Sequence, residues 1–244
     1  RSTLFPYTTL FRSSIRNRIN GSIDVYQRKT KDLLNKVPVA SGTNLTNYLL
    51  MNVGDMENKG IEGALNVVAI EKKDLRWEVG VNVAYNKNKI TRLTASDDPS
   101  YPGVETGDIS GGVGNKIQIQ KVGNPINSFY VFQQVYGEDG KPLEGVYVDR
   151  NHDGQITDDD RYVYYKPDAD VNIGFNTEIS YKKWTLSASL RSSLGNYVYN
   201  NIASNTEMKA DMWTNNFICN RVATAPYINF QQAQYKSDYY VQNA

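Results

Sequence analysis

The 244-residue sequence predicts an all-β fold, an antiparallel transmembrane β-barrel present in part and carrying long extracellular loops. Three observations predict it. Apolar and polar residues alternate along two pairs of segments, and each pair is joined by a turn of only a few residues. Aromatic residues stand beside both turns, where a barrel places its interfacial girdle. A long connection separates the pairs, and short turns on one side with long loops on the other are typical of outer-membrane barrels.

The first predicted hairpin covers residues 61–86. Small or apolar residues occupy the odd positions from Ile61 to Ala69, and a short polar turn follows at 71–75. The return segment alternates in the same way, so one of its faces is apolar. The residues of this segment that we expect to face lipid are Trp77, Val79, Val81 and Val83.

The second predicted hairpin covers residues 171–191, with Lys182 and Lys183 in its turn. Apolar residues again alternate with Asn, Gly, Glu, Ser and Thr. The residues that we expect to face lipid here are Phe175, Ile179, Tyr181, Trp184, Leu186 and Leu190. In the segment before these hairpins, Ile19, Ile23 and Val25 share one parity and indicate an earlier strand.

Periodicity alone fits a soluble β-sandwich equally well, because the strands of a sandwich also alternate. Connection lengths favour the barrel, since the region 87–170 separates the hairpins and loops of that length are uncommon in compact domains unless they are functional. If residues 77–86 run outward and residues 171–181 run back, the region between them holds either zero or two spanning strands. Both numbers fit the sequence.

Composition removes several classes of function. The 27 Lys and Arg residues nearly balance the 26 Asp and Glu residues, so the basic excess of a nucleic-acid-binding protein is missing. Cys219 is the only cysteine and His152 the only histidine, which rules out an intrachain disulfide and a Cys/His zinc site. No apolar run reaches the roughly 18 residues of a helical membrane span. Ser192 and Ser193 have no nearby base to activate them, and we predict no catalytic residue, no organic cofactor and no enzyme activity.

One segment resembles a metal site. Residues 149–160 follow the calcium-loop spacing D-x-N-x-D-G-x-I-x-x-x-D, in which Gly154 allows the sharp turn. The predicted oxygen ligands are Asp149, Asn151, Asp153, the Gln155 carbonyl and Asp160, with Thr157 binding directly or through water. Both flanks look extended, so we expect a structural calcium site without the helices of an EF-hand. The alternative is an Asx-rich turn held by side-chain to backbone hydrogen bonds.

The first thirteen residues contain Thr-Leu-Phe twice, with Arg-Ser at each end. They look like translated sequencing-adaptor read-through, so residues 1–13 are excluded from the fold prediction. Residues 14–244 are expected to form the barrel part, including the long loop region 87–170.

Five stretches resemble one family in order. Residues 52–62 (NVGDMENKGIE) resemble the N-x-G-x-x-x-N-x-G-x-E run at the start of a barrel strand in SusC/RagA-type TonB-linked outer-membrane proteins. Residues 86–90 (NKNKI) resemble the end of that family's following strand, and residues 123–130 (GNPINSFY) resemble its G-x-P-x-x-S-F-Y segment. The acidic loop from Asp149 and the run at 195–200 follow in the family's order.

The resemblance implies the late strands of a plugged barrel of about 22 strands. It also implies import of oligosaccharides or peptides across the outer membrane of a Bacteroidetes-like bacterium. The implied partners are outer-membrane lipid, a SusD-like surface lipoprotein, and TonB acting through N-terminal regions that these motifs do not include. A secreted, calcium-stabilised β-sandwich that binds carbohydrate stays the alternative.

Overall fold

The computed structural model describes residues 9–15, 18–38, 42, 45, 48–94, 101–112, 114–209, 213–214 and 217–244. The chain divides into two compact units. The first, here called the sheet unit, comprises residues 1–101 and 168–196. The second, here called the loop unit, comprises residues 102–167 and 197–244.

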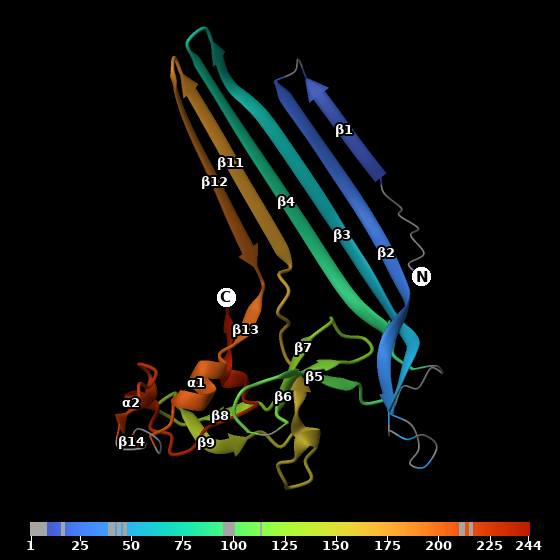
Figure 1. Ribbon diagram of the computed structural model, residues 1–244, viewed down its shortest axis with the longest axis vertical. Helices are drawn as coiled ribbons and strands as arrows, with labels where there is room; N and C mark the ends of the chain where they lie inside the picture. The colour runs from blue at the N-terminus through green and yellow to red at the C-terminus, as the bar shows by residue number, and fades with distance from the viewer. Residues whose placement is uncertain are drawn as a thin grey trace. The chain divides into compact units, whose positions relative to one another are not determined.

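The sheet unit is a six-stranded antiparallel sheet with the strand order β1-β2-β3-β4-β11-β12 (Figure 1). Its strands are β1 (Thr9–Ile15), β2 (Ile19–Pro38), β3 (Tyr48–Lys72), β4 (Leu75–Arg92), β11 (Val171–Tyr181) and β12 (Trp184–Leu194). The two predicted hairpins are confirmed as β3 with β4 and β11 with β12. Two-residue turns at 73–74 and 182–183 join them.

β4 pairs directly with β11, with Trp77 opposite Ile179 and Val83 opposite Ile173. Among the described residues, no strand of this sheet therefore lies between the two hairpins, which agrees with the first of the two alternatives, zero spanning strands in the region 87–170. β4 itself runs on to Arg92, into the region predicted as loop, because residues 86–92 continue to pair with β3. Polar residues on both faces of that stretch hide the strand from a search for alternation.

β1 includes residues 9–13 of the segment excluded above, and it pairs with residues 19–25 of β2. The pairing is a ladder of backbone hydrogen bonds, which most side chains permit at a sheet edge. This pairing therefore does not test the prediction that residues 1–13 come from a sequencing adaptor. Residues 1–8 lie outside the described part of the chain.

The register separates apolar and polar residues onto opposite faces. Leu65, Val81, Phe175 and Leu190 stand opposite one another in one row across four strands. One residue along, the row consists of Asn66, Gly80, Asn176 and Ser189. Directly opposite residues share a face and successive residues alternate, so the sheet has an apolar face and a polar face.

The loop unit is built from short elements. A four-stranded sheet has the order β10-β7-β6-β5, and the pairs β8-β9, β13-β16 and β14-β15 accompany it. The strands are β5 (Val104–Asp108), β6 (Lys116–Gln120), β7 (Ser128–Val131), β8 (Gln134–Tyr136), β9 (Pro142–Tyr147), β10 (Tyr162–Val163), β13 (Tyr197–Tyr199), β14 (Trp213–Thr214), β15 (Phe217–Ile218) and β16 (Val241–Asn243). The helices are η1 (Asp158–Asp160), α1 (Asn201–Thr206), α2 (Ala225–Ile228) and η2 (Asp238–Tyr240).

Two buried clusters hold the loop unit together. One contains Phe129, Val131 and Val241, and the other contains Phe230 and Tyr240. The first joins residues from before and after the second hairpin, so it forms only when both segments are present, whereas the second is built from residues that follow that hairpin. Of the helices in the described residues, none is long and apolar enough to span a membrane.

Candidate functional site

The apolar face of the sheet unit carries all ten residues predicted to face lipid. The register places on one face Trp77, Val79, Val81, Val83, Phe175, Ile179, Tyr181, Trp184, Leu186 and Leu190. Trp184 is 81% exposed, Leu186 71% and Leu190 65%. Contiguous apolar surface of this extent marks a contact with a membrane or another protein. Contact with lipid itself stays a prediction.

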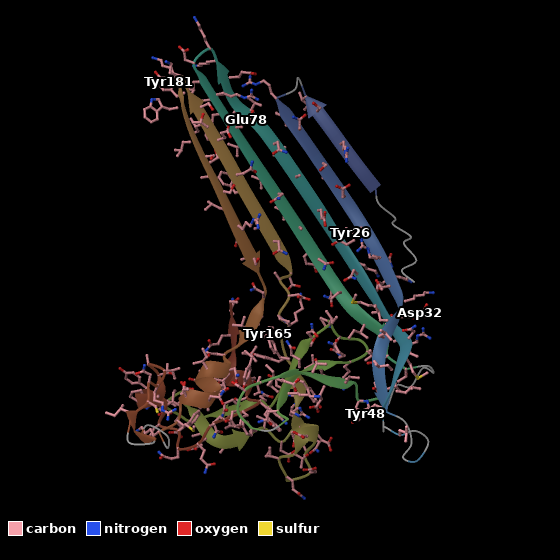
Figure 2. The ribbon with its side chains drawn as sticks, viewed as in Figure 1. Tyr26, Asp32, Tyr48, Glu78, Tyr165 and Tyr181 are labelled. Atoms are coloured by element: carbon pink, nitrogen blue, oxygen red, sulfur yellow. The ribbon has the colours of Figure 1, made fainter. Side chains whose placement is uncertain are left out.

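Aromatic residues gather at the end of the sheet that carries the short turns. Tyr181 stands opposite Trp184, and Figure 2 shows Tyr181 at this end of the sheet. The Nε1 atom of Trp77 donates a hydrogen bond of 2.8 Å to the hydroxyl of Thr177. The Nζ atom of Lys182 lies 5.3 Å from the centroid of the Tyr181 ring. An apolar ring with a satisfied polar atom suits the boundary between hydrocarbon and water.

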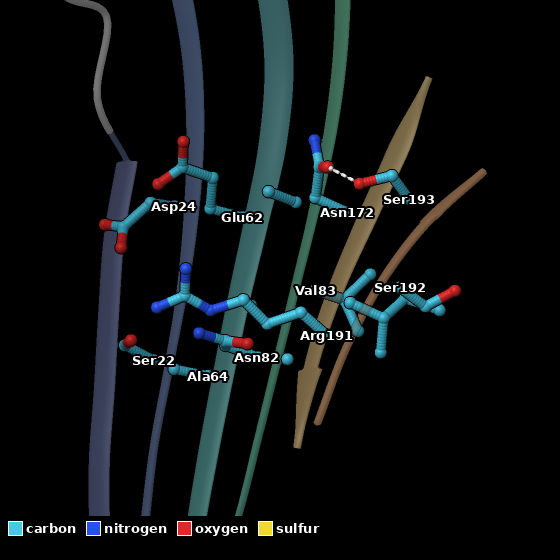
Figure 3. A pocket seen from close by; sticks show the side chains of 14 residues that line it. Ser22, Asp24, Glu62, Ala64, Asn82, Val83, Asn172, Arg191, Ser192 and Ser193 are labelled. Carbon is cyan, nitrogen blue, oxygen red and sulfur yellow. Dashed lines mark hydrogen bonds between the residues drawn. The ribbon is translucent and has the colours of Figure 1, made fainter. Parts of the chain in front are cut away.

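The polar face has a hollow lined by side chains from five strands (Figure 3). Arg191 of β12 reaches across this face beside Asn82, and Asp24 and Glu62 lie on the same face. The Ser193 hydroxyl donates to the amide oxygen of Asn172 at 2.9 Å, so this serine is held by an amide and not by a base. The surface offers charged and amide groups to water, to polar solutes or to another polypeptide.

Glycines let side chains of the polar face lie across neighbouring strands. A Cβ atom at Gly60 would stand 2.5 Å from Cζ of Tyr26, and one at Gly174 would overlap Oδ1 of Asn82. Tyr26 is labelled in Figure 2, and its hydroxyl donates a hydrogen bond of 3.2 Å to Oδ1 of Asn86. Gly60 is the second glycine of the N-x-G-x-x-x-N-x-G-x-E run, so the close approach of Tyr26 explains why that position takes no side chain.

The calcium-type loop at 149–160 is closed by hydrogen bonds from its own backbone. Asp149 accepts from the N–H groups of His152 at 2.7 Å and Gly154 at 2.8 Å. Asp153 accepts from the N–H of Gln155 at 2.8 Å. His152 and Gly154 have φ values of 61° and 82°, which produces the sharp turn. The flanking segments are strands β9 and β10, as expected for a loop without EF-hand helices.

Asp160 lies at the centre of this loop and is fully buried. Its carboxylate accepts from the N–H groups of Thr157 at 2.8 Å, Arg150 at 2.9 Å and Asn151 at 3.3 Å. These bonds, the one from Thr157 above all, lower the pKa of the Asp160 carboxyl. Among the described residues, no group of three or more acidic, His or Cys side chains is placed to hold a metal ion. The hydrogen bonds agree with an Asx-rich turn, and calcium binding stays a prediction.

The loop unit buries two charged residues that the sequence does not single out. Glu207 is 2% exposed and accepts from the hydroxyl of Tyr239 at 3.3 Å. Burial and the neighbouring Glu207 raise the pKa of Tyr239 to about 12. The Arg161 guanidinium pairs with Asp158 at 3.1 Å and lies 4.4 Å from the centroid of the Tyr130 ring. Tyr239 and Tyr130 come from segments about 30 residues away from Glu207 and Arg161, so a local pattern does not reveal these contacts.

The amino-acid sequence matches a known family. The family model described as TonB dependent receptor-like, beta-barrel matches residues 10–146. The TonB-dependent receptor SusC of Bacteroides thetaiotaomicron is 44% identical over 234 residues, which is 94% of this chain and 23% of SusC. The TonB-dependent receptor P26 of Formosa agariphila is 30% identical over 77% of this chain and 20% of its own length.

Solved structures share the fold. The RagAB peptide transporter matches with a TM-score of 0.66 at 24% identity, covering 93% of this chain and 26% of that one. The 'open-open' state of the RagAB peptide importer matches with a TM-score of 0.67 at 22% identity, covering 94% and 25%. The chain thus spans about a quarter of the length of the relatives that it matches. From these matches and its two-faced antiparallel sheet, the chain belongs to the TonB-dependent receptor β-barrel family and is of the SusC/RagA type.

Proposed function

We propose that this chain forms wall and external loops of an outer-membrane importer that takes up oligosaccharides or peptides with energy from TonB. In this role the apolar face contacts lipid and the polar face lines the interior of the barrel. The loop unit stands outside the membrane. The chain itself catalyses no reaction.

The observation that carries the proposal is the two-faced sheet in a chain 44% identical to SusC over 94% of its length. A spanning strand needs only about 9–11 residues, and β11 and β12 have 11 each. β3 and β4 are longer, with 25 and 18 residues, and so have room to extend beyond a bilayer.

Substrate class and partners rest on the relatives. RagAB is described as a peptide importer, and the motifs at 52–62 and 123–130 resemble SusC/RagA proteins. We accordingly propose a SusD-like surface lipoprotein as a partner, and TonB acting through a part of the protein outside this chain.

A secreted β-sandwich is the competing function. Its strands would bury their apolar side chains beneath a second sheet. Trp184, Leu186 and Leu190 are instead exposed on an open sheet in the part of the chain that the structure describes. A sheet that contacts lipid therefore explains the exposure of these apolar side chains, and a β-sandwich does not.

The test uses the full-length protein that contains this chain. We expect it to require detergent in solution, to insert into lipid vesicles, and to restore uptake of a labelled oligosaccharide or peptide in a cell from which its gene is deleted. Removing the TonB-contacting segment should abolish uptake without preventing insertion. A protein that is monodisperse without detergent and does not enter vesicles would contradict the proposal.

We also propose that residues 149–160 bind calcium as a structural ion in an external loop. Each carboxylate oxygen has a second lone pair beyond the one used by a backbone N–H group, so the hydrogen-bonded loop retains donor capacity toward a cation. The sharp turn at His152 and Gly154 supports this proposal.

A further inference from the structure

Four exposed lysines continue the apolar face of the sheet unit toward its long-loop end. They are Lys29 of β2, Lys59 of β3, and Lys87 and Lys89 of β4, and together they are called the lysine patch. Lys59, Lys87 and Lys89 lie in the family motifs at 52–62 and 86–90, and none of the four lysines has a role in the sites described above.

The register shows that the lysine patch lies on the apolar face. Val25, Ile61 and Tyr85 form one row across β2, β3 and β4. Two residues along, the row is Gln27, Lys59 and Lys87, and the next row is Lys29, Glu57 and Lys89. Residues two apart in a strand share a face, so the lysines stand on the same side as the apolar row that precedes them.

The lysine patch begins where the apolar band ends. On β4 the residues of this face between Trp77 and Tyr85 are Val79, Val81 and Val83. From Trp77 to Tyr85 the strand rises about 27 Å, or roughly 20 Å along a barrel axis from which it tilts by about 40°. A barrel's apolar band is about 25 Å tall and has an aromatic girdle at each edge. Tyr85 fits the second girdle, and the lysines then stand at the level of lipid headgroups.

The charges of the lysine patch are not balanced from within the sheet. Glu57 is the one acidic residue in these two rows, and it pairs with Lys59 at 3.1 Å. Lys87 and Lys89 form no ion pair with a described residue. Lys59 and Lys87 stand directly opposite each other, and like charges in that position repel. An anion bound between them would remove this cost.

We propose that the lysine patch binds the phosphate of an anionic lipid headgroup in the leaflet on the long-loop side of the membrane. This inference rests on the proposed function, because it needs the apolar face to contact lipid. A lipid fits better than a soluble anion, since the lysines adjoin the apolar band directly, and a lysine in that place keeps its aliphatic stem against apolar surface while its ammonium group reaches the headgroup. Lysine supplies a compact charge suited to phosphate.

The test titrates the full-length protein in detergent with phosphatidylglycerol and counts bound lipids by native mass spectrometry. The variant is Lys87→Gln with Lys89→Gln. The matched control is Lys121→Gln with Lys141→Gln, which removes two charges from the loop unit. Each lysine near an anionic surface contributes about a fivefold change in affinity, so the variant should bind about 25-fold more weakly. The control should stay within twofold of the unmodified protein.

Two results would overturn the inference. One is equal binding of phosphatidylglycerol by the variant and the unmodified protein. The other is displacement of the lipid by inorganic phosphate at equal concentration, which would indicate a site for free phosphate. Insertion into phosphatidylcholine vesicles is measured separately. Failure of the unmodified protein to insert contradicts the proposed function, whereas normal insertion without preference for phosphatidylglycerol contradicts only the lysine patch.

Discussion

Trp77 and Thr177 satisfy each other's polar atoms on the apolar face of the sheet. The indole N–H of Trp77 on β4 donates to the hydroxyl of Thr177 on β11 at 2.8 Å, and that hydroxyl donates in turn to the backbone oxygen of Glu78 at 3.1 Å. A face that contacts hydrocarbon offers no water to replace either bond. The pair therefore lets two polar groups stand at the edge of an apolar band.

A double-mutant cycle on this pair should reveal coupling. Trp77→Phe removes the donor, and Thr177→Val removes the acceptor and leaves the indole N–H unsatisfied. We expect each single change to lower the free energy of unfolding of the full-length protein by about 1–3 kcal/mol, with a coupling of about 1 kcal/mol. The measurement is urea unfolding in detergent micelles or vesicles. Additive single effects would show that the bond contributes nothing.

A charge should destabilise the protein much more on the apolar face of β12 than on its polar face. Leu190→Arg puts a cation on the apolar face near the middle of the strand, and we expect a loss of about 2–4 kcal/mol of stability in a bilayer. Ser189→Arg puts the same side chain on the polar face beside Arg191, and its cost should stay below about 1 kcal/mol. Folding into vesicles, followed by gel mobility, compares the two. Equal losses of stability in the two variants would contradict the prediction that one face contacts lipid and the other contacts water.

The raised pKa of Tyr239 predicts alkaline weakening of the loop unit. A phenol whose folded pKa is about 12 stabilises the fold fully below its ordinary value of 10.0, and that stabilisation is lost as pH rises through 12. Ultraviolet titration of Tyr239→Phe should show one tyrosine fewer ionising near pH 12 than the unmodified protein does. Tyr227→Phe is the control, because Tyr227 is 72% exposed. An unchanged titration in Tyr239→Phe would contradict the assignment.

Calcium removal should loosen the loop at 149–160. We expect the full-length protein to bind calcium with a Kd of about 0.1–1 mM, the range of extracellular loops. In EGTA, trypsin should cleave after Arg150 faster than in calcium. Asp149→Asn with Asp153→Asn should cleave equally fast in both, and Asp139→Asn should behave like the unmodified protein. If the cleavage rate is the same with and without calcium in the unmodified protein and in both variants, the loop is an Asx-rich turn that does not bind calcium.

Much of the sheet unit could be predicted from local sequence. The alternation from Trp77 to Tyr85 and from Val171 to Tyr181 assigns both strands and their apolar sides, because the side-chain period of a strand depends on the strand alone. The family motifs at 52–62 and 123–130 also depend only on neighbouring residues. The comparisons confirm the family and the fold that these motifs predict.

Other features depend on which strands lie next to each other. The sequence leaves open whether β4 and β11 are neighbours, and it hides the last part of β4 because polar residues occupy both of its faces. The buried positions of Glu207 and Arg161 arise from segments that meet only after the loop unit folds.

The sequence by itself determined the fold family and which face of each hairpin is apolar, because both follow from the order and period of nearby residues. Only the tertiary structure decided that Tyr26 lies over Gly60, and that lysines from three strands stand together beyond Tyr85. The physical reason is register: contacts between strands depend on how far one chain segment slides along another, and that is set by the whole sheet.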